Sequence, residues 1–238
     1  MVYFRKLILL VLTLILVVST SSFAQDTDVE KGLNLAKEKK YQEAIWMYEQ
    51  CLKNAPSNAD LYFYLGNAYL DLLNFEKAIE KFSQALSINA KYSDAYFNRA
   101  SCYFQSKKYD LAYLDYSHVI SIDSTNTNAY YLRGNCSYKL SKFKNAIIDY
   151  EKVLQSDQSS HTLAFDLGNS YFSLGEFETA LKHYDRAIEL NNTYSNYYFN
   201  RAITEFNLGF PEDACADFSN AKDLGDTEAI GYIKELCK

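Results

Sequence analysis

The sequence predicts an all-α fold, an α-solenoid of six helix-turn-helix repeats of 34 residues followed by a C-terminal capping helix. From Gln25 onward the chain resembles itself at a strict shift of 34 residues, as stacked supersecondary units do. When positions are numbered 1 to 34 in each repeat, position 20 is alanine and position 24 is aromatic in all six repeats. The chain holds only 8 Gly and 2 Pro in 238 residues, which favours long helices with few interruptions.

The first 24 residues have the features of a secretory signal peptide. Arg5 and Lys6 precede an apolar run from Leu7 to Val18, and small residues stand three and one before a cut after Ala24. The run is shorter than the roughly 20 residues that cross a bilayer as a helix. We therefore expect export, cleavage, and no membrane span in the mature chain. Retention of residues 1–24 as a membrane anchor, with residues 19–24 continuing the helix, is the alternative.

Six repeats are expected after the signal peptide, at residues 25–58, 59–92, 93–126, 127–160, 161–194 and 195–228. Positions 4, 8 and 11 share one helical face, and positions 17, 20, 24, 27 and 28 share another, because an α-helix repeats every 3.6 residues. Each repeat is therefore two amphipathic helices joined by a turn at positions 15 and 16. Small residues at positions 8 and 20 let the helices approach, so a larger residue there would overpack the contact by about 1–3 kcal/mol.

The two ends of the array differ from its middle. The first repeat carries Asp28 and Lys31 at positions that are otherwise apolar, which suits a terminal repeat with one face in solvent. Residues 229–238 are expected to form the capping helix, with Ala229, Tyr232 and Ile233 on its packing side.

This pattern resembles the tetratricopeptide repeat (TPR). The signature of that family appears as YFYLGNAY from Tyr62 to Tyr69, followed by Ala78, Phe82 and Ala85. The resemblance covers Gln25 to about Glu228 and implies a right-handed solenoid that acts as a protein-interaction scaffold. Together with the signal peptide it is typical of exported bacterial TPR proteins, which implies the periplasm or cell envelope of a Gram-negative bacterium.

The family resemblance also implies a concave groove lined by the first helix of each repeat, with positions 2, 5, 6, 9, 12 and 13 pointing into it. Aromatic and asparagine side chains recur at these positions: Phe63, Asn67, Phe97, Asn98, Tyr131, Asn135, Phe165, Asn169, Phe199 and Asn200. Asparagine has both a donor and an acceptor and can hold an extended peptide backbone. A default concave surface without a ligand is the competing interpretation, because these residues are common in the family.

Charged residues at the groove positions narrow the expected partner. Acidic side chains gather in the first three repeats: Asp26, Glu30, Asp60, Asp71 and Asp94, opposed only by Lys37. The clamp with which some relatives bind a terminal carboxylate is not matched, because Phe63, Asn128 and Leu132 stand where it needs cations. We therefore expect a neutral or basic polypeptide segment as the partner. The alternative function is a structural component of an envelope complex that assembles through convex or edge surfaces.

Other function classes are disfavoured by composition and motifs. The formal net charge is −6 and no basic run is present, so nucleic acid is not an expected partner. His118, His161 and His183 occupy three different repeat positions, and no catalytic, metal-binding or phosphate-binding motif occurs. We expect no enzyme activity, no cofactor and no metal. Arg99, beside the candidate Asn98, is expected to lay its stem across a helix seam with its guanidinium in water.

The cysteines carry one further prediction, since export would place them in an oxidising compartment. Cys102 and Cys136 occupy the same position of neighbouring repeats, roughly 20 Å apart, so this pair should stay reduced. Cys215 faces the region where the capping helix must dock, and that helix ends at Cys237. A Cys215–Cys237 disulfide is the prediction, and two buried thiols are the alternative.

Overall fold

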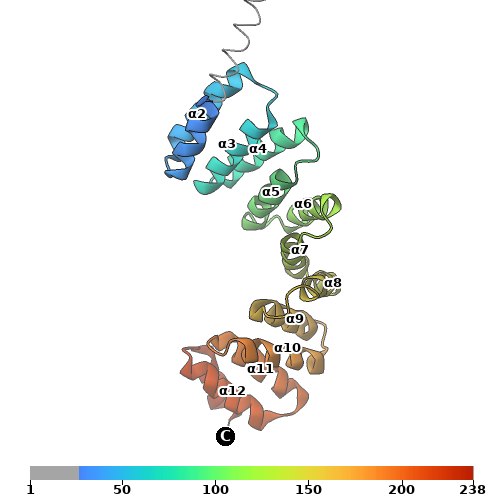
Figure 1. Cartoon of the computed structure of the whole chain (residues 1–238). Coiled ribbons are helices and arrows are strands. Elements are labelled where there is room, and N and C mark those ends of the chain that lie inside the picture. Colours follow the sequence, from blue (N-terminus) through green and yellow to red (C-terminus); the bar gives the residue numbers. More distant parts are fainter. Residues whose placement is uncertain (1–26, 238) are drawn as a thin grey trace, which may run out of the picture. The chain divides into compact units, whose positions relative to one another are not determined.

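The computed structural model describes residues 27–237, and within that range it is helical with no strand. After a helical segment at 27–37, the helices are α2 (Tyr41–Asn54), α3 (Ala59–Asp71), α4 (Phe75–Ile88), α5 (Ser93–Gln105), α6 (Tyr109–Ile122), α7 (Thr127–Lys139), α8 (Phe143–Leu154), α9 (His161–Ser173), α10 (Phe177–Leu190), α11 (Ser195–Leu208), α12 (Pro211–Asp223) and α13 (Glu228–Leu236). Figure 1 shows their order along the chain. Among the described residues no helix is both long and apolar enough to span a bilayer.

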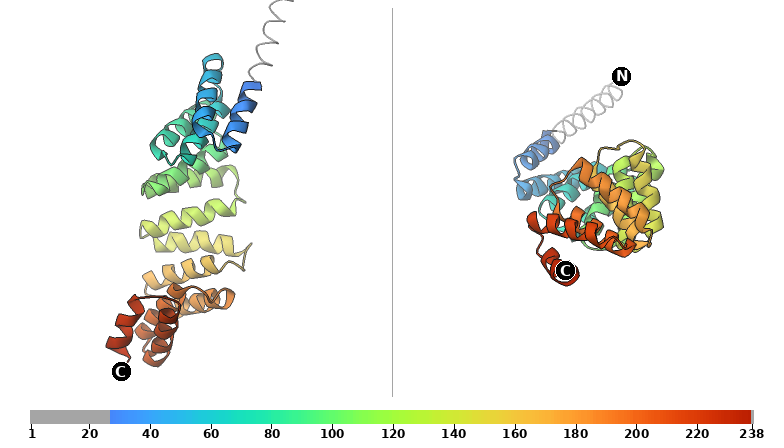
Figure 2. Two further views of the ribbon diagram at one scale, coloured as in Figure 1. Left: turned by 90° about the vertical axis from the view of Figure 1, so that its left-hand side faces the viewer. Right: turned by 90° about the horizontal axis from the view of Figure 1, so that it is seen from below.

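The helices follow the 34-residue period. The helices α3, α5, α7, α9 and α11 begin at position 1 of the second to sixth repeats, and the even-numbered helices from α2 to α12 begin at position 17. The all-α repeat fold predicted from the sequence is therefore confirmed. The chain divides within α6 into an N-terminal unit that ends at His118 and a C-terminal unit that begins at Val119. In each unit the helices follow one another as antiparallel hairpins (Figure 2).

The core of each repeat is built by the two residue types that define the period. The position 20 alanines are at most 1% exposed, as are the rings at position 24: Tyr48, Phe82, Tyr116, Tyr150, Tyr184 and Phe218. In the four repeats with glycine at position 8, the ring lies against the first helix at that glycine. A Cβ built on Gly168 would stand 2.6 Å from the Tyr184 ring, closer than real Cβ contacts. Position 8 is therefore small because the ring of the second helix occupies the space beside it.

The turn between the two helices of a repeat has one backbone conformation throughout. Position 15 is left-handed in every repeat, at Lys39, Leu73, Lys107, Ser141, Gly175 and Gly209, with φ between 57° and 84°. The next residue closes the first helix: the N–H of Asn74 donates to the Tyr69 carbonyl over 2.9 Å, for example. This is the Schellman arrangement that satisfies the last carbonyls of a helix. Four of the six repeats adopt it without glycine.

Buried ion pairs join the two helices of three repeats, and they correct the prediction for Arg99. Its guanidinium does not point into water: Nε and Nη2 donate to the Asp115 carboxylate over 2.7 and 2.8 Å. Arg133 with Asp149, and Arg201 with Asp217, repeat the contact between positions 7 and 23. Position 7 lies one helical turn from positions 4 and 11 and so faces the second helix.

The C-terminal end is closed by α13. Ala229 is fully buried, and Ile233 and Leu236 pack against the core of the last repeat. Cys215 in α12 and Cys237, directly after α13, form a disulfide with their Cα atoms 5.7 Å apart. Cys51, Cys102 and Cys136 are free and buried.

Candidate ligand-binding face of the first helices

The aromatic residues at position 5 are both surface and core residues. Each is partly exposed and packs on the position 24 ring of its own repeat, as Phe165 does on Tyr184 with centroids 5.7 Å apart. Phe63, Phe97, Tyr131 and Phe199 make the same contact at 5.5 to 5.8 Å. Such tilted and edge-on ring pairs add about 0.5–1.5 kcal/mol beyond burial alone. These side chains are therefore held rigidly, with one side available to a ligand. The side of the first helices that carries positions 2, 5, 6, 9, 12 and 13 is called the first-helix face below.

The asparagines of this face are joined in pairs instead of forming an open ladder. Asn98 donates from Nδ2 to Oδ1 of Asn67 over 2.8 Å, and Asn200 donates in the same way to Asn169. In the fourth repeat the hydroxyl of Tyr150 donates to Asn135 Oδ1 over 2.7 Å. In both pairs the position 9 asparagine (Asn67 or Asn169) uses its carbonyl inside the protein. Its NH₂ group and the carbonyl of the position 6 asparagine (Asn98 or Asn200) remain for a ligand.

Four of the five acidic residues predicted at groove positions lie in the described range, and all four are exposed. Asp26 lies outside the described residues. Glu30, Asp60, Asp71 and Asp94 are all exposed in the N-terminal unit. Asp60 accepts a hydrogen bond from the Tyr92 hydroxyl over 2.8 Å, and Tyr92 in turn packs on Phe63. This part of the face is acidic and aromatic at once.

The corresponding acid in the C-terminal unit is shielded. Asp166 accepts a hydrogen bond from the Tyr131 hydroxyl over 2.7 Å. Burial raises the pKa of Asp166, and the bond from Tyr131 and the charge of Lys139 partly offset that rise. Desolvation, followed by the charge of Asp166, raises the pKa of Tyr131 in turn. Neither group presents an open charge comparable to those of the N-terminal unit.

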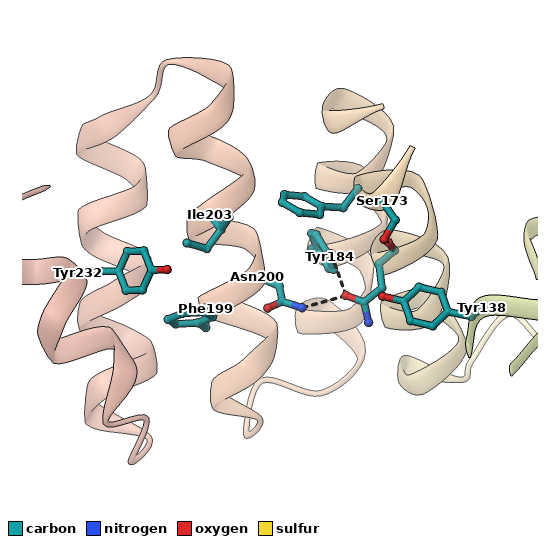
Figure 3. Close-up of a pocket in the computed structure, with 9 residues that line it drawn as sticks. Tyr138, Ser173, Tyr184, Phe199, Asn200, Ile203 and Tyr232 are labelled. Atoms are coloured by element: carbon teal, nitrogen blue, oxygen red, sulfur yellow. Dashed lines mark hydrogen bonds between the residues drawn. The ribbon is translucent and has the colours of Figure 1, made fainter. Parts of the chain in front are cut away.

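A pocket of about 390 Å³ opens on the first-helix face of the C-terminal unit (Figure 3). Its lining consists of aromatic, amide, hydroxyl and aliphatic side chains: Tyr138, Asn169, Phe172, Ser173, Tyr184, Phe199, Asn200, Ile203 and Tyr232. No charged side chain is among them. Three of these residues, Asn169, Phe199 and Asn200, belong to the groove predicted from the sequence. We call it the α13 pocket, because Tyr232 of α13 closes one side.

Sequence reasoning missed the other lining residues for identifiable reasons. Tyr138 and Phe172 stand at position 12, which is aromatic in four of the six repeats, and Ser173 stands at position 13. The family resemblance directs both positions into the groove, but the predicted aromatic and amide contacts were confined to positions 5, 6 and 9. Tyr232 was placed on the packing side of the capping helix. In the structure it stacks on Phe218 at 5.0 Å, meets Phe199 edge-on at 5.3 Å, and stays 38% exposed.

Each of the three histidines contacts a tyrosine side chain. His118 stacks on Tyr96, His161 lies 2.7 Å from the Tyr197 hydroxyl, and His183 stacks on Tyr171. Burial lowers the pKa of His183. Across residues 27–237, no group of three or more His, Cys, Asp or Glu side chains is arranged to hold a metal ion.

Comparisons with known proteins agree with this architecture. Models of the tetratricopeptide repeat match residues 29–94, 93–126 and 127–160, and a model described as a TPR repeat matches residues 168–209. The structure resembles a crystal structure of YrrB, described as a TPR protein with an unusual peptide-binding site. That match has a TM-score of 0.71 and 18% identity over 79% of this chain and 98% of YrrB.

Two further solved structures show the same likeness. PilF of Pseudomonas aeruginosa matches with a TM-score of 0.68 and 18% identity over 89% of this chain and 97% of PilF. MamA matches with a TM-score of 0.64 and 23% identity over 68% of this chain and 94% of MamA. At these identities the likeness establishes the fold alone. No curated protein matches the chain.

Proposed function

Because the chain belongs to the tetratricopeptide repeat family, we propose that it is a protein-interaction scaffold whose first-helix face binds a neutral or basic polypeptide segment. The α13 pocket is the observation that carries this proposal. It places aromatic walls beside the Asn169–Asn200 pair, and these are the two kinds of contact that an extended peptide needs. YrrB, which shares the fold, is described as having a peptide-binding site.

The magnitudes show why both kinds of contact are needed. A neutral hydrogen bond contributes about 1 kcal/mol net, whereas micromolar affinity requires about 8 kcal/mol. A few amide contacts fall well short of that value. Rings such as Phe199 and Tyr232, already fixed by their neighbours, would supply the remainder without a large loss of side-chain entropy.

Charge sets a different preference in each unit. The exposed carboxylates of Glu30, Asp60, Asp71 and Asp94 favour Lys or Arg in a segment bound to the N-terminal unit. The uncharged α13 pocket favours a neutral segment in the C-terminal unit. A terminal carboxylate finds no cation among the lining residues of the pocket.

We place this activity in the periplasm or cell envelope. The sequence of residues 1–24 supports export, and a disulfide at Cys215–Cys237 suits an oxidising compartment. The family is typically non-catalytic, and no enzymatic role is proposed.

The alternative function, assembly of a larger complex through other surfaces, has an observation of its own. Trp46, Leu114 and Ile148 stand at position 22 of their repeats and are 58%, 55% and 64% exposed. Each leaves a large apolar side chain in water on the second helix of its repeat. Such residues are common in interaction surfaces, although single ones also occur on ordinary surfaces.

A pair of matched substitutions separates the two functions. Ser173→Arg puts a long cation at an exposed position of the pocket wall, and Ile148→Arg puts the same side chain on the outer face of a second helix. Crosslinking in the envelope fraction, followed by mass identification of bound chains, is the measurement. We expect the partner to be lost with Ser173→Arg and kept with Ile148→Arg. The opposite result would favour assembly through the outer surface.

A further inference from the structure

We propose that the α13 pocket is a subsite for one aromatic side chain of an uncharged, extended segment, and that the Cys215–Cys237 disulfide completes it by holding Tyr232 in its wall. This inference rests on the proposed function and deepens it, because it names the chemistry of the bound segment and the element that makes the site.

The walls of the pocket define the side chain that it fits. Phe172, Phe199 and Tyr232 offer ring surfaces, Ile203 offers an aliphatic surface, and the lining holds neither a cation nor a carboxylate. A Lys or Asp side chain entering the pocket would lose hydration without gaining an ionic partner. An aromatic side chain would instead gain the edge-on and offset contacts that these rings already make with each other. The volume of about 390 Å³ lies at the small end of ligand pockets and suits one large side chain with its backbone.

The amide pair beside the rings matches a single peptide group. Oδ1 of Asn169 accepts from both Asn200 Nδ2 and the Tyr184 hydroxyl, at 2.8 and 2.9 Å. These two bonds fix both amides in place. The NH₂ of Asn169 and the carbonyl of Asn200 are left as a fixed donor and acceptor. They can hold the carbonyl and the N–H of an extended backbone whose ring enters the pocket.

The wall formed by Tyr232 depends on α13. This helix has 9 residues, fewer than an isolated helix needs to be stable in water, and Gly231 near its middle weakens it further. Ala229 is its only fully buried residue. The disulfide at its end ties it back to α12 across 22 residues of chain. Reduction therefore frees the end of α13 and lets Tyr232 leave Phe199 and Phe218.

The test uses small probes and a methyl resonance inside the pocket. The oxidised protein, with ¹³C-labelled isoleucine δ1 methyl groups, is titrated with N-acetyl-phenylalaninamide, which carries one ring between two peptide groups. N-acetyl-lysinamide and N-acetyl-alaninamide are the matched controls. We expect a saturable shift of the Ile203 methyl signal with the phenylalanine probe alone, and no shift of Ile79 in the N-terminal unit. Equal shifts with the lysine probe, or no saturable shift, would overturn the subsite.

Variants and reduction test the role of α13. Tyr232→Ala should weaken the phenylalanine probe about five- to tenfold, the loss of one or two ring contacts, whereas Tyr232→Phe should keep it. Reduction, or the double change Cys215→Ser with Cys237→Ser, should weaken it to a similar extent while the Ile79 signal shows that the N-terminal unit stays folded. Unchanged affinity after reduction would refute the part assigned to the disulfide.

Failure of the subsite can be told from failure of the proposed function. If the phenylalanine probe does not bind but Ser173→Arg still releases the partner, the subsite is wrong and the peptide-binding face stands. If the probe binds while Ser173→Arg leaves the partner attached, the subsite is supported and the proposed function is contradicted.

Discussion

At the scale of single residues, two sites carry a local energetic cost: the left-handed backbone at position 15 and the buried carboxyl of Glu205. Left-handed backbone costs an L-residue about 1–2 kcal/mol, and four repeats accept that cost while two use glycine. Glu205 occupies position 11, which is aromatic in the second, third and fifth repeats. Its carboxyl is buried next to Asp217, and Oε2 has no hydrogen-bond partner. Both positions yield direct tests.

Leu73→Gly should stabilise the protein by about 0.5–1 kcal/mol, because glycine relieves the left-handed strain but loses more entropy on folding. Little packing is lost, since Leu73 is 72% exposed. Gly175→Ala should cost about 1 kcal/mol from backbone strain alone, as nothing lies within 4 Å of the added Cβ. Urea unfolding measures both. Leu72→Gly is the control, because Leu72 has an ordinary φ of −81° and the change should only destabilise.

Glu205→Gln should make stability less dependent on pH. Burial, followed by the charge of Asp217, raises the pKa of Glu205 to about 7, and the charges of Asp213 and Asp185 add to the rise. Only the Arg201 guanidinium, with its Nε 3.9 Å from Oε1, lowers that pKa. The native state then holds a proton that the unfolded state has lost, so stability falls as pH rises from the unfolded pKa toward 7.

The expected result for this variant is a thermal midpoint a few degrees higher at pH 8 and nearly unchanged near pH 4.5. Glu212→Gln, at an exposed position of α12, is the matched control. An equal effect of Glu205→Gln at both pH values would contradict a buried, protonated carboxyl.

At the scale of elements, the two helices of every repeat share the same core packing, whereas the contact between positions 7 and 23 varies. The third, fourth and sixth repeats place Arg and Asp at positions 7 and 23. The fifth has Leu167 and His183 there, with His183 stacked on Tyr171 of position 11. The same two helices are therefore joined either by ionic or by apolar and aromatic contacts. The third repeat also has a tyrosine at position 11, Tyr103, so it can be converted to the other arrangement.

Arg99→Leu alone should destabilise the protein by about 2–4 kcal/mol, because Asp115, with a side chain only 5% exposed, is left buried without its partner. The double change Arg99→Leu with Asp115→His reproduces the fifth repeat and should recover a large part of that loss. Urea unfolding of the two variants and of Asp115→His measures the recovery as an interaction energy. If the double variant loses as much free energy of unfolding as the two single variants together, the two arrangements are not interchangeable.

At the scale of the whole chain, stability should be distributed along the array, because each repeat contacts only its neighbours. Three buried thiols report on this distribution: Cys51 in the first repeat, Cys102 in the third and Cys136 in the fourth. Burial raises the pKa of Cys102 to about 11 and that of Cys136 to about 12, so both react only when the surrounding repeat opens.

We expect Cys51 to be alkylated faster than Cys102 and Cys136 under native conditions, because a terminal repeat has one stacked neighbour. Mass spectrometry of peptides after timed iodoacetamide treatment gives the three rates, and the Cys215–Cys237 disulfide should remain unlabelled. Equal rates at the three thiols would indicate that the chain opens as one cooperative unit.

The residues of the candidate binding face were predictable only in part. Positions 5, 6 and 9 were identified because the family resemblance directs them into the groove and they carry recurring aromatic and asparagine residues, and Phe199, Asn169 and Asn200 do line the pocket. Ile203 was missed because it replaces the asparagine that recurs at position 9. Phe172 was missed although position 12 is aromatic in four repeats, because the predicted contacts were confined to positions 5, 6 and 9. A search for departures from the repeat average at groove positions would have found Ile203, and a search for recurring aromatic residues at position 12 would have found Phe172.

The sequence by itself determined the helix pairs and their core. Small residues at positions 8 and 20 and a ring at position 24 pack the two helices together in every repeat. Because they recur every 34 residues, they define where each helix pair begins. Only the tertiary structure decided that Arg99 turns inward to Asp115, that Asn200 is bonded to Asn169, and that Tyr232 closes a pocket. These contacts join different helices, and their partners depend on how neighbouring helices are rotated and stacked. A periodic pattern records which face of a helix is buried, but it does not record which side chain of the next helix that face meets.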